Sequence, residues 1–224
     1  MKVFVSWSGG KDCSYVRYLA EQRGLEVKYL LNMVSLDGKI SWSHNMPAEI
    51  LAAQSLAMGI PLIQHRTNQA EYEAEFKKAL RELKEQGITG GVFGDIDFEP
   101  HREWVTRVCR DAGIEPLLPL WGLSQDDIMA DFIKTGHKSM VVVTKAELMG
   151  EEWLGRIINE AFLRDLNELR RTKDVTVCGE AGEYHTLVID GPLFEKEMVI
   201  RETSRSLKEG YWLLGIDNYE LRDK

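Results

Sequence analysis

The sequence lacks most features that mark secreted, membrane-spanning or zinc-binding proteins. Its 224 residues include only three cysteines and no apolar run long enough to span a bilayer. Cys13, Cys109 and Cys178 are odd in number, far apart and outside any CxxC pair, so no disulfide framework or zinc site is predicted. Lys2 leads into a short apolar segment rather than a signal-peptide core. We therefore expect a cytoplasmic protein with reduced thiols and no membrane partner.

The sequence also lacks an excess of positive charge. The 28 Lys and Arg residues are outnumbered by 36 Asp and Glu, which leaves a net charge of −8. Proteins that bind nucleic acid through its phosphates normally show a basic excess or a basic stripe, so a nucleic-acid partner is not expected. The content of 44% hydrophobic and 29% charged residues is that of a globular chain, long enough for one large domain or two small ones.

The N-terminal stretch holds the densest set of candidate binding residues. Residues 3–7 predict a strand, and two glycines separate them from a segment with helical apolar spacing that ends before Gly24. A strand that turns through glycines into a helix is an anion site, because the first helical N–H groups lack intrahelical partners and the helix dipole adds positive charge. Gly9 and Gly10 let the backbone approach a phosphate, and Lys11 adds a mobile point charge. The candidate nucleotide contacts are Ser8, Gly9, Gly10, Lys11, Asp12, Cys13 and Ser14.

The order Ser-Gly-Gly-Lys-Asp in this loop differs from the nucleotide motifs GxxxxGK[ST] and GxGxxG. It resembles the pyrophosphate loop SGGxDS/T of the N-type ATP pyrophosphatases, enzymes that cleave ATP between the α and β phosphates. One position departs from that loop, because Cys13 stands where Ser or Thr is usual, and so one hydroxyl donor is missing beside Ser14. The alternative interpretation is a glycine turn that starts an ordinary α/β domain.

Predicted strands and helices alternate through the first half of the chain. The strands are predicted at residues 3–7, 26–34, 61–63, 90–95 and 115–118, and helices between them at 50–58, 70–86 and 100–112. This alternation predicts right-handed crossovers and a parallel sheet with helices on both faces. Ligands bind at the carboxyl ends of such strands, so Asp95 and Met33 are candidates there. Met33 would cover an adenine or simply pack into the core.

The pattern changes after residue 121. A helix opened by Ser124 with Asp127 is predicted to end near Gly136, and residues 151–171 are predicted to be mostly helical. Strands are predicted at 140–143, 175–178, 186–189, 198–203 and 211–216. We therefore expect an ATP-binding α/β domain over residues 1–121 and a smaller α+β substrate domain over 122–224.

A second dense stretch, GEAGEYHT at residues 179–186, lies between two predicted strands. A carboxylate from Glu180 or Glu183 could hold ammonium or take its proton. His185 could do the same or orient one of the glutamates. The alternative is an ordinary glycine-containing turn whose charges face water.

Residues 179–194, GEAGEYHTLVIDGPLF, resemble the GE-GE-HT signature of the diphthine–ammonia ligase family. Motifs similar to that family's also occur as SHN at 43–45, GDI at 94–96, HREW at 101–104 and PLWG at 119–122. The resemblance covers almost the whole chain. It implies a Rossmann-like, adenine nucleotide alpha hydrolase-type parallel sheet with a smaller C-terminal α+β domain.

The resemblance further implies ATP-dependent amidation of diphthine, a modified histidine on translation elongation factor two, by ammonia. The implied route runs through an acyl-adenylate and releases AMP and pyrophosphate, with Mg²⁺ offsetting the phosphate charge. The implied catalytic residues are Lys11, Asp12, Glu180, Glu183 and His185. Asp12 and Asp95 are metal candidates, and His44 and Gly94 are further nucleotide contacts. The candidate acceptor contacts are Arg102, Trp121, Glu180 and Glu183.

Two alternatives stay open at the level of sequence. One is another ATP pyrophosphatase that adenylates a different carboxylate or a tRNA base. The other is a non-catalytic adenine-nucleotide-binding protein, which would have no use for the two glutamates of the second stretch. The ammonia source and the oligomeric state, including a homo-oligomer, are not fixed by the sequence.

Overall fold

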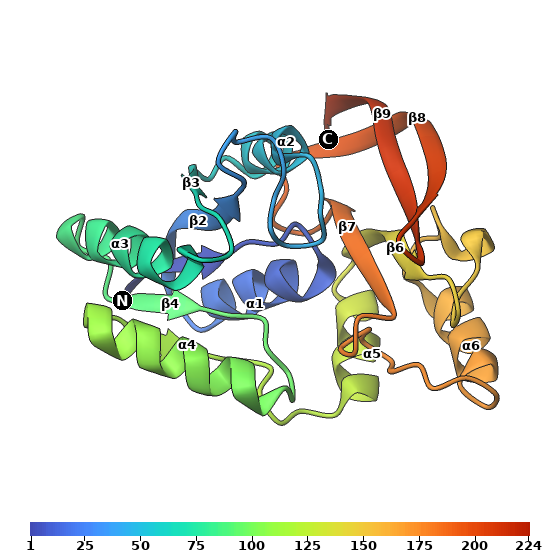
Figure 1. The fold of residues 1–224 in the computed structure, drawn as a ribbon, viewed down its shortest axis with the longest axis horizontal. Coiled ribbons are helices and arrows are strands. Elements are labelled where there is room, and N and C mark those ends of the chain that lie inside the picture. The colour runs from blue at the N-terminus through green and yellow to red at the C-terminus, as the bar shows by residue number, and fades with distance from the viewer. The chain divides into compact units, whose positions relative to one another are not determined.

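The computed structural model describes all residues from Met1 to Lys224, and it divides into two units (Figure 1). The first unit comprises residues 1–8 and 12–122, and the second comprises residues 9–11 and 123–224. Each unit has a sheet of its own. No helix of the structure combines the length and the apolar composition needed to cross a membrane.

The first unit alternates strands with helices, as the sequence predicts. In chain order its elements are β1 (Lys2–Ser6), α1 (Lys11–Gln22), β2 (Glu26–Val34), α2 (Ala48–Met58), β3 (Leu62–Arg66), α3 (Tyr72–Glu85), β4 (Gly90–Val92), α4 (Glu99–Ala112) and β5 (Glu115–Leu117). All strand pairs are parallel, in the order β3-β2-β1-β4-β5. The predicted parallel α/β sheet is thereby confirmed.

The sheet of the first unit is buried on both faces. Phe4 of β1 lies in a core cluster with Phe76 and Leu80 of α3 and Val105 of α4. The neighbours of Phe4 in the strand point to the opposite face, and Val5 is also fully buried. Burial on both faces explains why the strands are continuous apolar runs rather than alternating ones.

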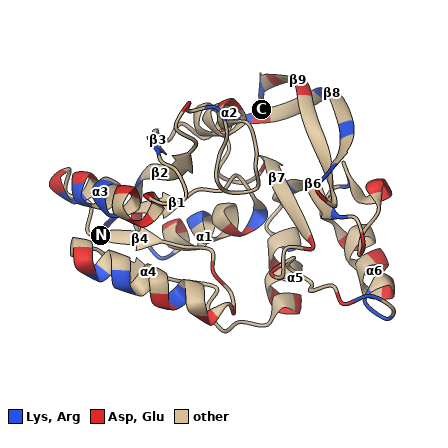
Figure 2. Cartoon of the chain, in the orientation of Figure 1, with Lys and Arg blue, Asp and Glu red and all other residues tan.

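Helices α3 and α4 carry mixed charges on their outer sides (Figure 2). Glu73 of α3 accepts hydrogen bonds from both terminal nitrogens of Arg107, at 2.6 and 2.7 Å, and from the indole of Trp104 at 3.0 Å. Lys77 joins this network, 2.8 Å from Glu73 and 2.7 Å from Asp111. Arg107 and then Lys77 hold the pKa of Glu73 far below its usual range. The charged residues on the two helices therefore link α3 to α4.

The second unit contains an antiparallel sheet. Its elements are α5 (Gln125–Lys134), β6 (Lys138–Lys145), the 3₁₀ helix η1 (Glu151–Trp153), α6 (Glu160–Leu169), β7 (Tyr184–Asp190), β8 (Lys196–Lys208) and β9 (Tyr211–Asp223). The strand order is β7-β6-β9-β8. Ser124 caps α5 as predicted, since its side chain accepts a hydrogen bond from the Asp127 N–H. Strands β8 and β9 are longer than predicted, and only parts of residues 151–171 are helical.

The prediction of a strand at residues 175–178 is wrong. The backbone N–H of Thr176 donates to Glu183, and that of Cys178 donates to the side chain of Gln125 at 2.9 Å. Side chains rather than a neighbouring strand therefore use these backbone groups. β-Branched residues favour extended backbone, but only pairing makes a strand.

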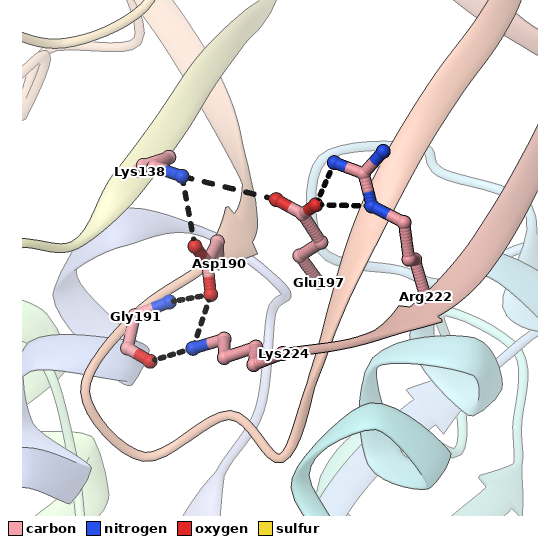
Figure 3. A network of polar contacts seen from close by, with 6 residues as sticks. All are labelled: Lys138, Asp190, Gly191, Glu197, Arg222 and Lys224. Atoms are coloured by element: carbon pink, nitrogen blue, oxygen red, sulfur yellow. Dashed lines mark hydrogen bonds and ion pairs between the residues drawn. The ribbon is translucent and has the colours of Figure 1, made fainter.

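Ion pairs hold together the ends of all four strands of the second sheet (Figure 3). Asp190 of β7 lies 3.0 Å from Lys138 of β6 and 2.5 Å from Lys224, which follows β9. Glu197 of β8 accepts a hydrogen bond of 2.6 Å from Nε of Arg222 in β9. Burial raises the pKa of Asp190, but the hydrogen bonds from the two lysines outweigh it, and the pKa lies below its usual value. This network fixes one corner of the sheet.

Candidate active site

The glycine loop connects β1 to α1, and Lys11 is the first residue of the helix. Gly9 has a φ of +83°, a left-handed conformation that favours glycine. Ser8 donates a hydrogen bond from its hydroxyl to the Cys13 sulfur at 3.3 Å, so the thiol takes part in the loop's own bonding. Cys13 and Ser14 are 4% and 3% exposed. The segment thus has the predicted strand–loop–helix order, in which a helix N-terminus favours an anion.

The side chain of Lys11 is not the mobile point charge that the sequence suggested. The residue is 4% exposed, and its ammonium group donates to the backbone carbonyl of Cys178. The ammonium also lies 5.7 Å from the ring centroid of Tyr184. A buried ammonium needs such partners, because transferring it from water without them is very costly. Lys11 is therefore held in one place by residues far along the chain.

The backbone of the loop is held as firmly as its lysine. The N–H of Val188 in β7 donates to the Gly9 carbonyl at 2.9 Å. The N–H of Lys11 donates to the hydroxyl oxygen of Thr186, also in β7, at 3.0 Å. Gly9–Lys11 accordingly belong with the second unit by their contacts. Strand β7 fixes the middle of the loop.

The end of β4 approaches the first turn of α1 closely at Gly94. A Cβ atom added to Gly94 would lie 3.1 Å from Cβ of Asp12 and 3.2 Å from the backbone nitrogen of Cys13, so a larger residue would crowd the helix start. Gly94 thus lies against the start of α1 at Asp12, and Asp95, the other metal candidate, follows Gly94 in the chain. The Asp95 carboxylate is also hydrogen-bonded to Nδ1 of His101.

These two carboxylates are a suitable donor set for Mg²⁺. The structure contains no group of three or more His, Cys, Asp or Glu side chains that could hold a metal by themselves. Mg²⁺ is usually bound through one or two carboxylates together with substrate phosphates and water, so Asp12 and Asp95 fit that mode.

In the glutamate-rich turn at residues 176–186, Glu183 faces inward. It is 1% exposed, and its two carboxylate oxygens accept hydrogen bonds from the N–H groups of Thr176, at 2.5 Å, and Ala181, at 2.9 Å. Gly179, with φ +76°, has no room for a Cβ, which would lie 2.7 Å from the Tyr184 carbonyl oxygen. Glu183 therefore anchors the turn, which argues against the expected role in holding ammonium.

Glu180 and His185 have different surroundings from Glu183. Glu180 is half-buried, and its backbone N–H donates to the hydroxyl of Thr176 at 2.8 Å. Burial, and then the charge of Lys11, lower the pKa of His185 to about 4, although Glu183 opposes the shift. At neutral pH His185 is an uncharged ring, able to accept or donate a hydrogen bond but not to act as a cation.

Almost the whole chain matches two family models. The family model described as "Diphthamide synthase N-terminal domain" matches residues 1–116, and the model described as "Diphthamide synthase C-terminal domain" matches residues 124–221. The chain belongs to the diphthamide synthase family. It is thus an enzyme of an ATP-dependent ligase family, and the recognition made from its motifs is confirmed.

Relatives from several vertebrates support this membership. The chain is 29% identical to diphthine–ammonia ligase of Mus musculus over 89% of its own length and 83% of the relative. It is 28% identical to that of Danio rerio, covering 91% and 88%, and 26% identical to that of Homo sapiens, covering 89% and 83%. Among solved structures, a predicted subunit of a tRNA methyltransferase from Methanocaldococcus jannaschii overlays with a TM-score of 0.48 at 15% identity, covering 86% of this chain and 98% of that chain.

Two residues that we expected at the ligand are placed differently in this family member. Met33 is 3% exposed and lies in the core cluster with Phe76, so it packs inside the first unit rather than covering a base. Trp121 carries the guanidinium of Arg102 on its ring, with Cζ 4.6 Å from the centroid, and Arg102 also bonds Glu99. The indole of Trp121, a candidate acceptor contact, therefore already has a cation of the protein on one face.

Two residues remain to be described: His44, a predicted nucleotide contact, and Thr186, which was not predicted at the site. His44 is half-buried and has a φ of +57°, an uncommon backbone conformation for a residue other than glycine. Thr186 was absent from the predicted site residues, although it is the last residue of the HT pair in the family signature. That pair was the one sequence signal that pointed to Thr186.

Proposed function

We propose that this protein catalyses ATP-dependent amidation of the carboxylate of diphthine on translation elongation factor two, using ammonia. Within this proposal the first domain binds ATP and the second binds the acceptor. The relatives are named diphthine–ammonia ligase, which implies a protein substrate carrying the modified histidine. That name specifies neither the acceptor protein nor the chemical route, which are part of the proposal.

The observation that carries the proposal is the loop at residues 8–14. It combines a left-handed Gly9, a helix that begins at Lys11 and the close approach of Gly94. Helical N–H groups and a fixed lysine suit the leaving pyrophosphate of an adenylation reaction, because preorganised donors stabilise the charge that develops there. The loop lacks the GxxxxGK[ST] arrangement that enzymes use for γ-phosphoryl transfer.

The proposed reaction has two steps. A carboxylate oxygen of the acceptor attacks the α-phosphorus of ATP, the bond between that phosphorus and the bridging oxygen breaks, and pyrophosphate leaves. Ammonia then attacks the acyl carbon, and AMP leaves with the pair of electrons of the acyl–oxygen bond. The attacking nitrogen loses a proton to a base, for which Glu180 is the candidate carboxylate.

Mg²⁺ has a place in this scheme at Asp12 and Asp95, where it would neutralise phosphate charge. Lys11 holds the loop, and Glu183 keeps the glutamate-rich turn in shape. The uncharged His185 orients its neighbours without adding a positive charge beside the incoming ammonia.

Product analysis tests the proposal. The protein is incubated with ATP, ammonium and diphthine-modified elongation factor, the nucleotides are separated by chromatography, and pyrophosphate is measured as the phosphate released by a pyrophosphatase. We expect AMP and pyrophosphate, formed in equal amounts with amide and only when the modified factor is present. ADP as the main product, or AMP formed equally well with unmodified factor, would contradict the proposal.

A further inference from the structure

Thr186 brings a hydroxyl group to the start of helix α1. Its oxygen lies 3.0 Å from the backbone nitrogen of Lys11, the first residue of that helix, and accepts its N–H. The residue is 3% exposed and lies in β7, two residues before Val188, whose N–H donates to the Gly9 carbonyl. The rigid sheet therefore positions this hydroxyl at the nucleotide loop.

The hydroxyl hydrogen of Thr186 is still unused. A threonine hydroxyl has one donor hydrogen and two acceptor lone pairs, and the bond from Lys11 occupies one lone pair. No acceptor for the hydrogen lies among the contacts of Thr186, although buried hydroxyl groups normally donate as well as accept. Since the oxygen faces the helix start, an anion there would be within reach of the hydrogen.

The loop itself lacks a hydroxyl that related loops have. Cys13 stands where the SGGxDS/T pattern has Ser or Thr, and its sulfur instead accepts a hydrogen bond from Ser8. A thiol is a weak donor, so the substitution leaves the loop one strong donor short. The two observations are complementary, because Thr186 offers a donor beside the helix start at which one is missing.

We propose that Thr186 donates a hydrogen bond from its hydroxyl to the leaving pyrophosphate and thereby supplies the donor that Cys13 lacks. This inference rests on the proposed function, in which residues 8–14 hold the phosphates of ATP. Lys11 and Thr186 then act as a pair. The threonine oxygen accepts the first helical N–H, and its own hydrogen is directed to the pyrophosphate.

The test measures binding of inorganic pyrophosphate and of AMP by calorimetry, with Thr186→Ala and Thr186→Ser compared to the unchanged protein. We expect Thr186→Ala to bind pyrophosphate about 10-fold more weakly, the factor that corresponds to about 1.4 kcal/mol. AMP affinity should stay the same, and Thr186→Ser, which keeps the hydroxyl, should keep pyrophosphate affinity. Adding Cys13→Ser to Thr186→Ala should recover most of the loss, because it restores a hydroxyl in the loop.

Thr144 provides the matched control. It is fully buried in the neighbouring strand β6, and its hydroxyl donates to the Gly150 carbonyl. Thr144→Ala removes a buried hydroxyl from the same sheet without touching the loop, so both affinities should be unchanged. If Thr186→Ala fails to fold, Thr186→Cys replaces it with the same expectation, since the thiol fills similar space and donates weakly.

Unchanged pyrophosphate affinity in Thr186→Ala would overturn the inference, as would an equal loss of AMP and pyrophosphate affinity, which indicates a purely structural cap. Either result leaves the proposed function standing as long as the unchanged protein still converts ATP to AMP and pyrophosphate. A protein that binds no pyrophosphate and forms ADP would contradict the proposed function itself.

Discussion

The loop at residues 8–14 and the turn at residues 176–186 both carry glycines, hydroxyls and charged side chains, but they use these groups differently. In the loop, helix α1 begins at Lys11 with the positive end of its dipole at the loop, and Gly9 adopts a left-handed conformation. In the turn, the carboxylate of Glu183 consumes two backbone N–H groups. The loop is therefore suited to bind an external anion, whereas the turn contains an anion of its own.

The two glutamates of the turn also differ from each other in their surroundings. Glu180 and Glu183 look equivalent in the sequence GEAGE, yet Glu183 is 1% exposed with both oxygens bonded, while Glu180 is half-buried. Burial of a charge requires partners, and those partners then determine the role of the side chain. Each of the following measurements tests one side of this comparison.

The largest effect is expected at Lys11. Lys11→Met keeps an unbranched side chain that is one atom shorter, and it removes the charge and the bond to the Cys178 carbonyl. We expect ATP turnover to fall at least ~100-fold, as is typical when one donor to a developing anion is lost. Because Lys11 is buried, the melting temperature should fall too.

Lys28→Met is the control, because the partner of Lys28 is the nearby residue Glu26. It should change neither ATP turnover nor the melting temperature. Normal turnover in folded Lys11→Met would exclude the loop as the phosphate site.

The second effect is expected at Glu183. Glu183→Gln keeps the shape but replaces one acceptor oxygen with an NH₂ group that faces a backbone N–H. We expect the free energy of unfolding to fall by about 2 kcal/mol, the usual cost of an unsatisfied buried donor. Pyrophosphate release and amide formation should decline together, because the whole turn is affected.

Glu180→Gln is the matched variant for this experiment. It should leave stability nearly unchanged and slow amide formation more than pyrophosphate release, since the lost carboxylate is the candidate base. Loss of the ammonia step alone in Glu183→Gln, at full stability, would reverse the roles that we assign to the two glutamates.

The third effect concerns pH. The pKa of His185 is lowered to about 4 in the folded protein, so between that value and the ordinary value near 6.5 the unfolded chain binds more protons. The contribution of His185 to the free energy of unfolding is therefore fully present above pH 7 and falls as the pH decreases toward 4. At pH 5 the loss relative to pH 7.5 should be about 2 kcal/mol.

Denaturant titrations at the two pH values, for the unchanged protein and for His185→Gln, isolate this contribution, because other titrating groups are common to both. An equal pH dependence of the two proteins would show that His185 titrates normally.

Sequence patterns predicted the parts of this molecule that depend on near neighbours. Strand and helix alternation, the loop around Gly9 and the cap at Ser124 follow from residues a few positions apart. The burial of Lys11 depends on Cys178 and Thr186, which lie 167 and 175 positions away. The failed strand at residues 175–178 has a similar cause, since Gln125 bonds Cys178 across 53 positions. Such partners are determined by tertiary packing, which local propensity and residue spacing do not predict.

The smallest effect is expected at Arg102 and Trp121 of the first unit, which line an open groove together with residues of α4. The guanidinium of Arg102 lies 4.6 Å from the Trp121 ring centroid. Cation–π pairs at exposed positions contribute about 0.5–1 kcal/mol. A double-mutant cycle with Arg102→Leu and Trp121→Leu should give a coupling of that size in the free energy of unfolding.

The same cycle decides whether the indole serves the acceptor. Because its face is already occupied by Arg102, we expect Trp121→Leu to leave the KM for the modified elongation factor unchanged, and Trp121→Phe to restore most of the lost stability. If Trp121→Leu instead raises that KM while Trp121→Phe does not, the ring contacts the acceptor, and Arg102 must move aside when the acceptor arrives. In that case Arg102→Leu should lower the KM, because it removes the competing cation. A KM that is unaffected by all three variants would assign both residues to the stability of the first unit alone.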